Sequence, residues 1–409
     1  MQNNKNIPVD WQMKFLGDIG TFSKGAGITK NDLVDIGKPC VRYAELYTKF
    51  EFVIPKCISF IPEDIAKKSK QIQKGCILFA GSGETKEEIG KCAVYDNDEI
   101  AYAGGDNIIY TIKDNYPVYL SYYLNTLGRR QLNKLGQGDS IVHIHAEDLK
   151  KVKIPLPPLP EQEKIAEILS CWDEAIEKVS SLISLKEKQK KGLMQRLLTG
   201  KTRLPGFTQP WKEVKLGDVC NFINGYMFKS ETYVDNGKYK IITIANVQQG
   251  FLDYNTTNSI NELPKDLQSN QILSIGDIVF SMTGNVGRVC RVSTVDCLLN
   301  QRVGKIVEKN ISKDFLYQLL LTDRFIRKME AFAQGGAQDN LSLKDVKKYK
   351  ITIPSDIAEQ KAIADILSTA DEEIEKLKSK LDLLKLQKKG LMQQLLTGKI
   401  RVKIKNDKY

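Results

Sequence analysis

Two stretches of the chain place aliphatic side chains at every third or fourth position, with charged residues between them. The first has apolar residues at Ile165, Ile168, Leu169, Trp172, Ile176, Val179, Leu182 and Ile183, and the second at Ile363, Ile366, Leu367, Ala370, Ile374, Leu377, Leu381 and Leu384. This spacing predicts two long helices, each with a single apolar stripe. We expect the first helix over Gln162–Leu198, and each helix ends at a Thr-Gly pair, where glycine commonly closes a helix.

The two helical stretches are copies of each other. Glu161–Arg203 recurs as Glu359–Arg401, with 27 of 43 positions identical at a constant offset of 198. Such an internal repeat predicts two similar halves about a pseudo-twofold axis. Because a long helix with one stripe needs a partner, we predict that the copies pair as an antiparallel coiled coil. The residues predicted at the helix-pair and subunit interfaces are Ile165, Ile168, Trp172, Ile176, Val179, Ile363, Ile366, Ile374, Leu377 and Leu381.

Each helix follows a long segment in which short strand-like runs alternate with loops rich in Gly and Asn. Cys76–Ala80, Ile241–Ala245 and Ile278–Ser281 have the composition of buried strands. Asp148–Ile154 and Asp345–Ile351 alternate charged and aliphatic residues, which predicts a last strand in each segment. The predicted fold class is α+β, with two mixed α/β domains. The expected boundaries are a first domain at 1–155, a spacer helix at 156–200, a second domain at 201–353, a second spacer helix at 354–401 and a basic tail at 402–409.

The charge of the chain is concentrated in the repeated segments. The net charge is +11, of which Lys186–Arg203 contributes +6 and Lys385–Arg401 contributes +5. One interpretation is an electrostatic surface for a polyanion such as DNA. The other is that Lys and Arg stabilise the last turns of long helices and keep them in solution.

Cysteine, histidine and hydropathy exclude several classes of protein. The eight cysteines form no CxxC pair, and His143 and His145 are the only histidines, so we expect reduced thiols and no metal site. No apolar run reaches the length of a membrane span, and the first residues are polar. These features predict a cytoplasmic protein without a membrane partner.

The repeated motifs resemble those of a known family. PLPPLPEQEKIAEIL at 155–169 and QKKGLMQRLLTGK at 189–201 are similar to the conserved helices of the DNA-specificity subunit of type I restriction–modification systems. The resemblance implies two target-recognition domains that contact double-stranded DNA, and helices that fix their spacing. It also implies an asymmetric bipartite target, two docked methyltransferase subunits that bind S-adenosylmethionine and methylate adenine, and two restriction subunits where the system has them.

Several loops also resemble those of target-recognition domains, among them 79–91, 136–145, 224–229, 280–288 and 300–302. DNA recognition combines contacts to phosphates, which suit Lys and Ser, with contacts to base edges, which suit Arg, Asn and Gln. The candidate DNA-binding residues are Lys24, Ser82, Lys86, Lys91, Gln137 and His143 in the first domain, and Lys229, Asn246, Asn285, Arg288, Gln301, Arg302 and Gln338 in the second. Each could instead form a turn or satisfy the local backbone.

The sequence lacks the motifs of an enzyme. An adenine methyltransferase needs a Gly-rich loop for its cofactor and an Asn/Asp-Pro-Pro-aromatic loop for the flipped base, and neither occurs here. We therefore predict a non-catalytic subunit with no cofactor of its own. Two alternatives remain open at this stage: a recognition subunit of a system without a nuclease, and a stand-alone DNA-binding regulator with a coiled coil.

Overall fold

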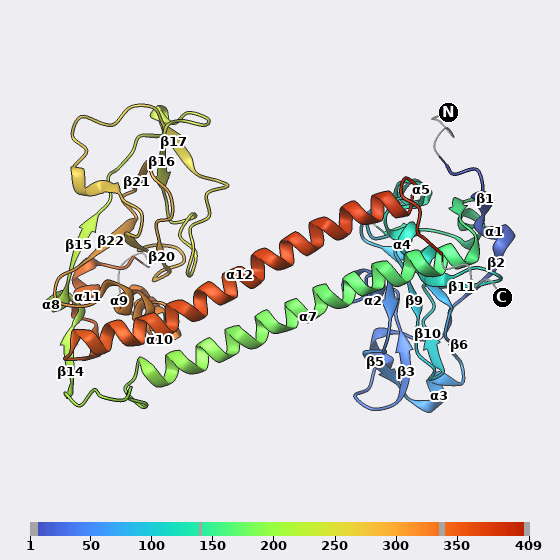
Figure 1. The fold of residues 1–409 in the computed structure, drawn as a ribbon, viewed down its shortest axis with the longest axis horizontal. Coiled ribbons are helices and arrows are strands. Elements are labelled where there is room, and N and C mark those ends of the chain that lie inside the picture. The colour runs from blue at the N-terminus through green and yellow to red at the C-terminus, as the bar shows by residue number, and fades with distance from the viewer. Residues whose placement is uncertain (1–6, 139–140, 335–339, 405–409) are drawn as a thin grey trace. The chain divides into compact units, whose positions relative to one another are not determined.

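The chain divides into two compact units in the computed structural model, which describes residues 7–138, 141–334 and 340–404. The first unit comprises Met1–Ser180 together with Lys380–Tyr409, and the second comprises Ser181–Ser379. Each unit contains one domain of short strands and helices, together with parts of both long helices (Figure 1).

The first domain is an α+β arrangement of short elements. In chain order these are β1 (Gln12–Phe15), α1 (Leu16–Ile19), β2 (Gly20–Lys24), η1 (Lys30–Asp32), β3 (Lys38–Val41), α2 (Glu45–Thr48), β4 (Val53–Ile54), β5 (Ser59–Ile61), α3 (Glu63–Ala66), β6 (Lys70–Ile72), β7 (Ile77–Ala80), β8 (Ser82–Gly83), β9 (Cys92–Tyr95), β10 (Ala101–Ala103), β11 (Asn107–Ile112), α4 (Pro117–Asn125), α5 (Arg129–Leu135), β12 (Val142–His143), α6 (Ala146–Leu149) and β13 (Lys153–Leu156).

Two sheets carry this domain. The main sheet has the order β2-β11-β7-β9-β4, and the second has the order β5-β3-β10-β6. All four side chains of β7 are buried, as expected for a continuous apolar run in the middle of a sheet. Strand β1 pairs with β13, so the first and last strands of the domain lie together at its junction with the long helix.

The second domain repeats this plan. Its elements are β14 (Trp211–Lys215), α8 (Leu216–Val219), β15 (Cys220–Asn224), η2 (Ser230–Thr232), β16 (Tyr239–Ile242), β17 (Asn258–Ile260), η3 (Ser269–Gln271), β18 (Ile272–Leu273), β19 (Ile278–Ser281), β20 (Val289–Arg291), β21 (Cys297–Leu299), β22 (Val303–Glu308), α9 (Lys313–Leu320), α10 (Asp323–Gln334), α11 (Leu343–Lys348) and β23 (Lys350–Pro354).

Strand order shows the correspondence between the two domains. The sheet β15-β22-β19-β20 matches β2-β11-β7-β9, and β17-β16-β21-β18 matches β5-β3-β10-β6. The second pair of sheets even shares its single parallel step, which joins β16 to β21 and β3 to β10. The internal repeat predicted from the helices therefore extends through both domains.

The two long helices are α7 (Leu159–Leu197) and α12 (Ile357–Leu395), and they pack together. In the first unit the start of α7 and the end of α12 share one core, which includes Ile165, Leu169 and Leu395. In the second unit Leu197, near the end of α7, shares a core with Ile363 and Leu367, near the start of α12. The helices are therefore antiparallel, as predicted.

The glutamate repeated near the start of each long helix has the same structural role in both units. Glu161 is buried and accepts hydrogen bonds from Trp11 Nε1 (3.1 Å) and from Arg401 Nε and Nη2 (both 2.7 Å). Glu359 likewise accepts from Trp211 Nε1 (3.3 Å) and from Arg203 (2.6 and 2.8 Å). Each Glu thus joins a tryptophan at the start of its domain, just before β1 or at the first residue of β14, to the segment that follows the end of the other helix.

The structure corrects some predicted boundaries. Helix α7 begins at Leu159 rather than Gln162, because Pro160 fits the first helical turn, where no backbone N–H is needed. Pro155 lies inside β13, the last strand of the first domain. The predicted last strands begin later, at Lys153 and Lys350, and the polar residues before them form the short helices α6 and α11.

Candidate nucleic-acid interface

Several loops of the first domain meet at one end of its main sheet. The Gly81 N–H donates to the Asp106 carbonyl (2.8 Å), and the Ile144 N–H donates to the Gly81 carbonyl (3.1 Å). The Gly25 N–H donates to the Asn107 carbonyl (2.9 Å). These bonds bring together residues 24–29, 81–91, 104–106, 136–138 and 141–144, which we call the loop edge of the first domain.

Two of these bonds recur in the second domain. The Met282 N–H donates to the Arg302 carbonyl (3.0 Å), and the Leu341 N–H donates to the Met282 carbonyl (2.9 Å). The Tyr226 N–H donates to the Leu299 carbonyl (2.8 Å), and the Tyr226 carbonyl accepts from the Gln301 N–H (2.9 Å). The loop edge of the second domain accordingly consists of residues 224–229, 282–288, 300–302 and 340–341.

One glycine makes each loop edge possible. A Cβ atom at Gly25 would lie 2.0 Å from the Gly104 carbonyl oxygen, and one at Gly225 would lie 1.9 Å from the Asn300 carbonyl oxygen. No other residue fits at these distances. The repeat has therefore kept glycine where two backbone segments touch.

The loop edge of the first domain brings together its six predicted residues. Lys24 ends β2 and is exposed, as is Lys86, while Lys91 is half-buried. Gln137 and His143 exchange two backbone hydrogen bonds (2.9 and 2.8 Å). The last of the six, Ser82, is only 4% exposed, and its Oγ lies 2.9 Å from His143 Nδ1. Ser82 thus orients the exposed His143 rather than presenting its own hydroxyl.

The loop edge of the second domain holds five of its seven predicted residues. Lys229, Asn285, Gln301 and Arg302 are exposed, and Arg288 is half-buried and donates to Gln248. Gln338 lies outside the described residues.

Asn246 does not fit the expectation of an exposed amide. It is fully buried: Oδ1 accepts from the Thr243 N–H (2.9 Å) and Oγ1 (2.7 Å), and Nδ2 donates to the Asp253 carbonyl (2.9 Å). It braces its own loop, because both ends of the amide are engaged within the domain.

Three further residues shape the loop edges, and the sequence did not single them out. Arg129 on α5 donates to the carbonyls of Glu87 (2.8 Å) and Ile89 (2.9 Å), and thereby holds the loop that carries Lys86. Gln248 accepts from Arg288, and Asn340 accepts from Arg302 Nη1 (3.2 Å). These contacts join residues far apart in the chain, so no local sequence pattern predicts them.

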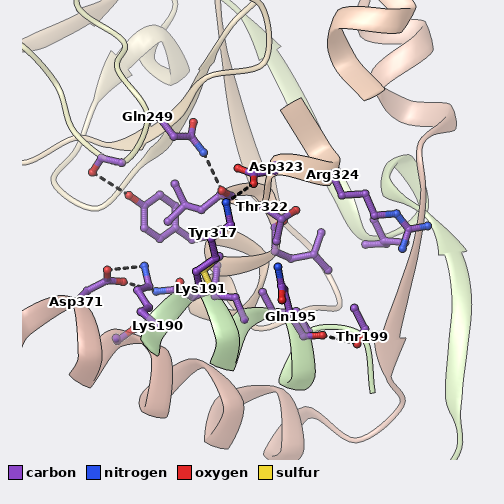
Figure 2. A pocket seen from close by; sticks show the side chains of 18 of the residues that line it. Lys190, Lys191, Gln195, Thr199, Gln249, Tyr317, Thr322, Asp323, Arg324 and Asp371 are labelled. Carbon is purple, nitrogen blue, oxygen red and sulfur yellow. Dashed lines mark hydrogen bonds and ion pairs between the residues drawn. The ribbon is translucent and has the colours of Figure 1, made fainter. Parts of the chain in front are cut away.

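A groove opens in the second unit between the domain and the long helices. Its volume is about 1940 Å³, and side chains from α7, α9, α10 and α12 line it (Figure 2). Lys190 on α7 pairs with Asp371 on α12 (2.5 Å), and Asp371 also accepts from the buried Gln318 of α9 (2.8 Å). Lys191 pairs with Asp323 (2.8 Å) at the α10 wall. We call this cavity the unit-2 groove.

The corresponding junction in the first unit is more tightly filled. The cavity there is about 530 Å³. Asp173 on α7 accepts hydrogen bonds from Lys388 on α12 and from the Tyr122 hydroxyl of α4. The Lys388 ammonium also lies 4.3 Å from the centre of the Phe52 ring. Asp173 and Asp371 are equivalent in the repeat, as are Lys190 and Lys388, so each junction uses one charge from each helix.

The predicted helix-interface residues lie along these packed faces. Ile165, Ile363 and Ile374 are buried, and Ile168, Trp172, Ile176, Val179, Leu377 and Leu381 are half-buried. Ile366 is 37% exposed, because it lies at the outer edge of its stripe. Other leucines of the same helices are more exposed, namely Leu182, Leu185, Leu383 and Leu386.

Two negative findings apply to residues 7–138, 141–334 and 340–404. Among them, no group of three or more His, Cys, Asp or Glu side chains could hold a metal ion. None of the helices in these ranges is long and apolar enough to cross a membrane.

Two equivalent domains, each with a glycine at the closest contact of its loop edge, and two antiparallel long helices make this a duplicated protein of α+β class. Residues 8–187 and 208–385 match the family model described as the type I restriction modification DNA specificity domain, so the chain belongs to this family. It is a specificity subunit of a type I restriction–modification system, a component that is non-catalytic and carries no cofactor.

The similarity to known proteins covers nearly the whole chain. The type I restriction enzyme MjaVIII specificity subunit of Methanocaldococcus jannaschii is 28% identical, with 97% of this chain and 94% of that protein covered. The putative type I restriction enzyme MjaX specificity subunit of the same organism is 29% identical, with 97% and 95% covered. The crystal structure of an S subunit from M. genitalium supports the fold: its TM-score is 0.65 at 20% identity, with 97% of this chain and 98% of that chain covered.

Proposed function

We propose that each domain binds one half of an asymmetric bipartite DNA site through its loop edge. The observation that supports this proposal is a shared backbone frame that carries different side chains. The first loop edge presents Lys24, Lys86 and His143, whereas the second presents Asn285, Gln301 and Arg302. Since base edges are distinguished by the donors and acceptors that approach them, one frame with two sets of side chains suits two different half-sites.

The proposed contacts divide by chemistry. Lys24, Lys86, Lys91 and Lys229 would bind phosphates, which position the domain on the duplex. Base edges would be contacted by Gln137, His143, Asn285, Arg288, Gln301, Arg302 and Gln338. Ser82 and Asn246 would act indirectly, because they are buried and hold the loops.

The long helices are proposed to set the distance between half-sites and to dock the partner subunits. The sequence would divide into recognition domains at 1–155 and 201–353, spacer helices at 156–200 and 354–401, and a basic tail at 402–409. Leu185 and Leu386 are 62% and 67% exposed on these helices. We place docking of two methyltransferase subunits on the helices, and of two restriction subunits where the system has them.

The partners would supply the reaction. S-adenosylmethionine would bind to the methyltransferase subunits, which would methylate an adenine in each half-site of chromosomal DNA in the cytoplasm. This chain would contribute the choice of site.

The decisive experiment is to co-express this chain with the methyltransferase encoded beside it and to sequence the host genome for modified adenines. We expect a single asymmetric motif of two short blocks around an unspecified gap, absent without this chain. Absence of new methylation despite a purified complex would refute the proposal and favour a stand-alone DNA-binding regulator.

A second experiment tests the spacing role. Insertion of about four residues after Ser180 and after its repeat equivalent Lys378 lengthens both helices by roughly 6 Å. At about 3.4 Å per base pair, the gap should grow by one to two base pairs. An unchanged gap in a folded, active insertion variant would contradict the idea that the helices set the spacing.

A further inference from the structure

Met227 is exposed at the tip of a loop that is otherwise firmly held. Its neighbour Tyr226 donates from its hydroxyl to Asp266 Oδ1 (2.7 Å), and the ring of Tyr226 packs edge-on against Phe228 with 4.9 Å between centroids. Phe228 is buried in a small core with Ile241. Met227, between these two anchored aromatic residues, is 67% exposed. The backbone at Met227 is therefore held by its two neighbours, while its apolar side chain projects into solvent.

The equivalent position of the other domain carries glycine in a different backbone conformation. Gly25 and Gly225 are equivalent at an offset of 200, as are the short helices η1 and η2 that follow them. Met227 then corresponds to Gly27, whose φ of +77° is in the region that favours glycine. Met227 does not belong to the non-glycine residues with positive φ, so the two loops differ in backbone conformation here, and the loop of the second domain extends an apolar side chain into solvent where the loop of the first has none.

The surroundings of Met227 belong to the loop edge. The backbone of Tyr226 is bonded directly to Gln301, and the exposed side chains nearby in the frame are Lys229, Gln301 and Arg302. Gln and Arg match the hydrogen-bonding edges of adenine and guanine in the major groove. The apolar group that a base pair presents among those edges is the C5-methyl group of thymine.

We infer that Met227 contacts the C5-methyl group of a thymine in the half-site bound by the second domain. This inference rests on the proposed function, because it requires the loop edge to face DNA. It makes Met227 a specificity-determining residue that distinguishes thymine from cytosine at one position.

The test uses the complex of this chain with its methyltransferase and a duplex that contains the methylated motif. Each thymine of both half-sites is replaced singly by deoxyuridine, which lacks the methyl group and keeps every hydrogen-bonding group. Affinity is measured by fluorescence anisotropy at one salt concentration for the natural chain, Met227→Ala and Met227→Leu. The matched control is Ile275→Ala, because Ile275 is 62% exposed in the same domain but precedes β19, whereas the loop edge follows that strand.

We expect one thymine at which deoxyuridine weakens binding about fourfold, the effect of withdrawing one methyl group from apolar contact. Met227→Ala should lose this sensitivity, while Met227→Leu and Ile275→Ala keep it. A motif with no thymine, no sensitive position, or equal sensitivity in Met227→Ala would each overturn the inference. Failure of the proposed function is distinguishable, because the natural complex would then bind no specific site with either base.

Discussion

The junction at Asp173 allows a quantitative test of how the first domain is held on the helices. The Asp173 carboxylate receives the Lys388 ammonium and the Tyr122 hydroxyl, and so joins α7, α12 and α4. The Lys388 side chain is 5% exposed and that of Asp173 is 31% exposed. Asp173→Ala would leave the buried Lys388 ammonium next to the rings of Phe52 and Tyr122, without the Asp173 carboxylate that now pairs with it.

The magnitude follows from burial. Removal of one partner from a buried ion pair typically costs about 3–5 kcal/mol. Because water reaches part of the Asp173 site, we expect about 2–3 kcal/mol, still well above the ~0–1 kcal/mol of an exposed pair. For a unit of this size each kcal/mol shifts the melting temperature by roughly 2–4 °C, so the first transition should fall by about 4–12 °C.

Differential scanning calorimetry of the full chain measures this shift. The matched control is Glu174→Ala, which removes the carboxylate of an exposed pair with Lys178, whose side chains are 68% and 77% exposed, and should change stability by less than about 0.5 kcal/mol. The double variant Asp173→Leu/Lys388→Met should recover most of the loss, because it removes the buried charge as well as its partner. If Asp173→Ala melts like Glu174→Ala, or if the double variant is no more stable than the single one, the reasoning about buried charge is wrong.

Three other predictions follow from single positions. Gly225→Ala should lower specific DNA affinity of the complex by tenfold or more while circular dichroism stays unchanged, since its Cβ would collide with the Asn300 carbonyl; natural affinity would contradict the rigid loop edge. Gly192→Ala and Gly390→Ala should each stabilise the chain by about 0.5–1 kcal/mol, because both lie inside helices with open space around a new Cβ, and a lowered melting temperature would show otherwise. At pH 8 iodoacetamide should modify exposed Cys171 well before Cys92 or Cys290, because burial raises the pKa of both of those thiols to about 12; mass spectrometry that found equal rates would refute this order.

The parts of the fold that the sequence predicted are those with a local or repeated signal. The three–four spacing around Ile165 and Ile363 marked the helices, and the repeat of Glu161 at Glu359 marked their equivalence. Their antiparallel packing followed from the need to cover two single stripes. The parallel step between β3 and β10 could not be predicted, because it joins strands far apart in the chain and leaves no periodic trace.

The loop edge was only partly predictable for the same reason. Exposed Lys86 and Gln301 lie in Gly-rich loops, which the sequence displays directly. Asn246 lies in a similar loop, yet tertiary contacts bury it, and residue type alone does not separate the two cases. Arg129 acts through backbone carbonyls 40 and 42 residues away, so only the folded structure relates it to the loop edge.

The charges at the two junctions have a consequence for how the chain chooses its own partner. Asp173 and Lys190 lie on α7, and their equivalents Asp371 and Lys388 lie on α12, so these two pairs would also form between two copies of either helix. The pairs Lys186–Glu373 (2.7 Å) and Lys378–Glu187 (3.3 Å) would not, because the equivalent residues are Leu384, Ala175, Ser180 and Lys385. The charges therefore select α12 as the partner of α7, but they do not favour the α12 of the same chain over that of another chain. What favours it is the tether of the second domain, which holds α12 near α7 at an effective concentration that reaches the millimolar range for short connections. Whether α7 pairs with the α12 of its own chain or of another chain then depends on the effective concentration set by the tether and on the protein concentration, and not on the sequence of the helices.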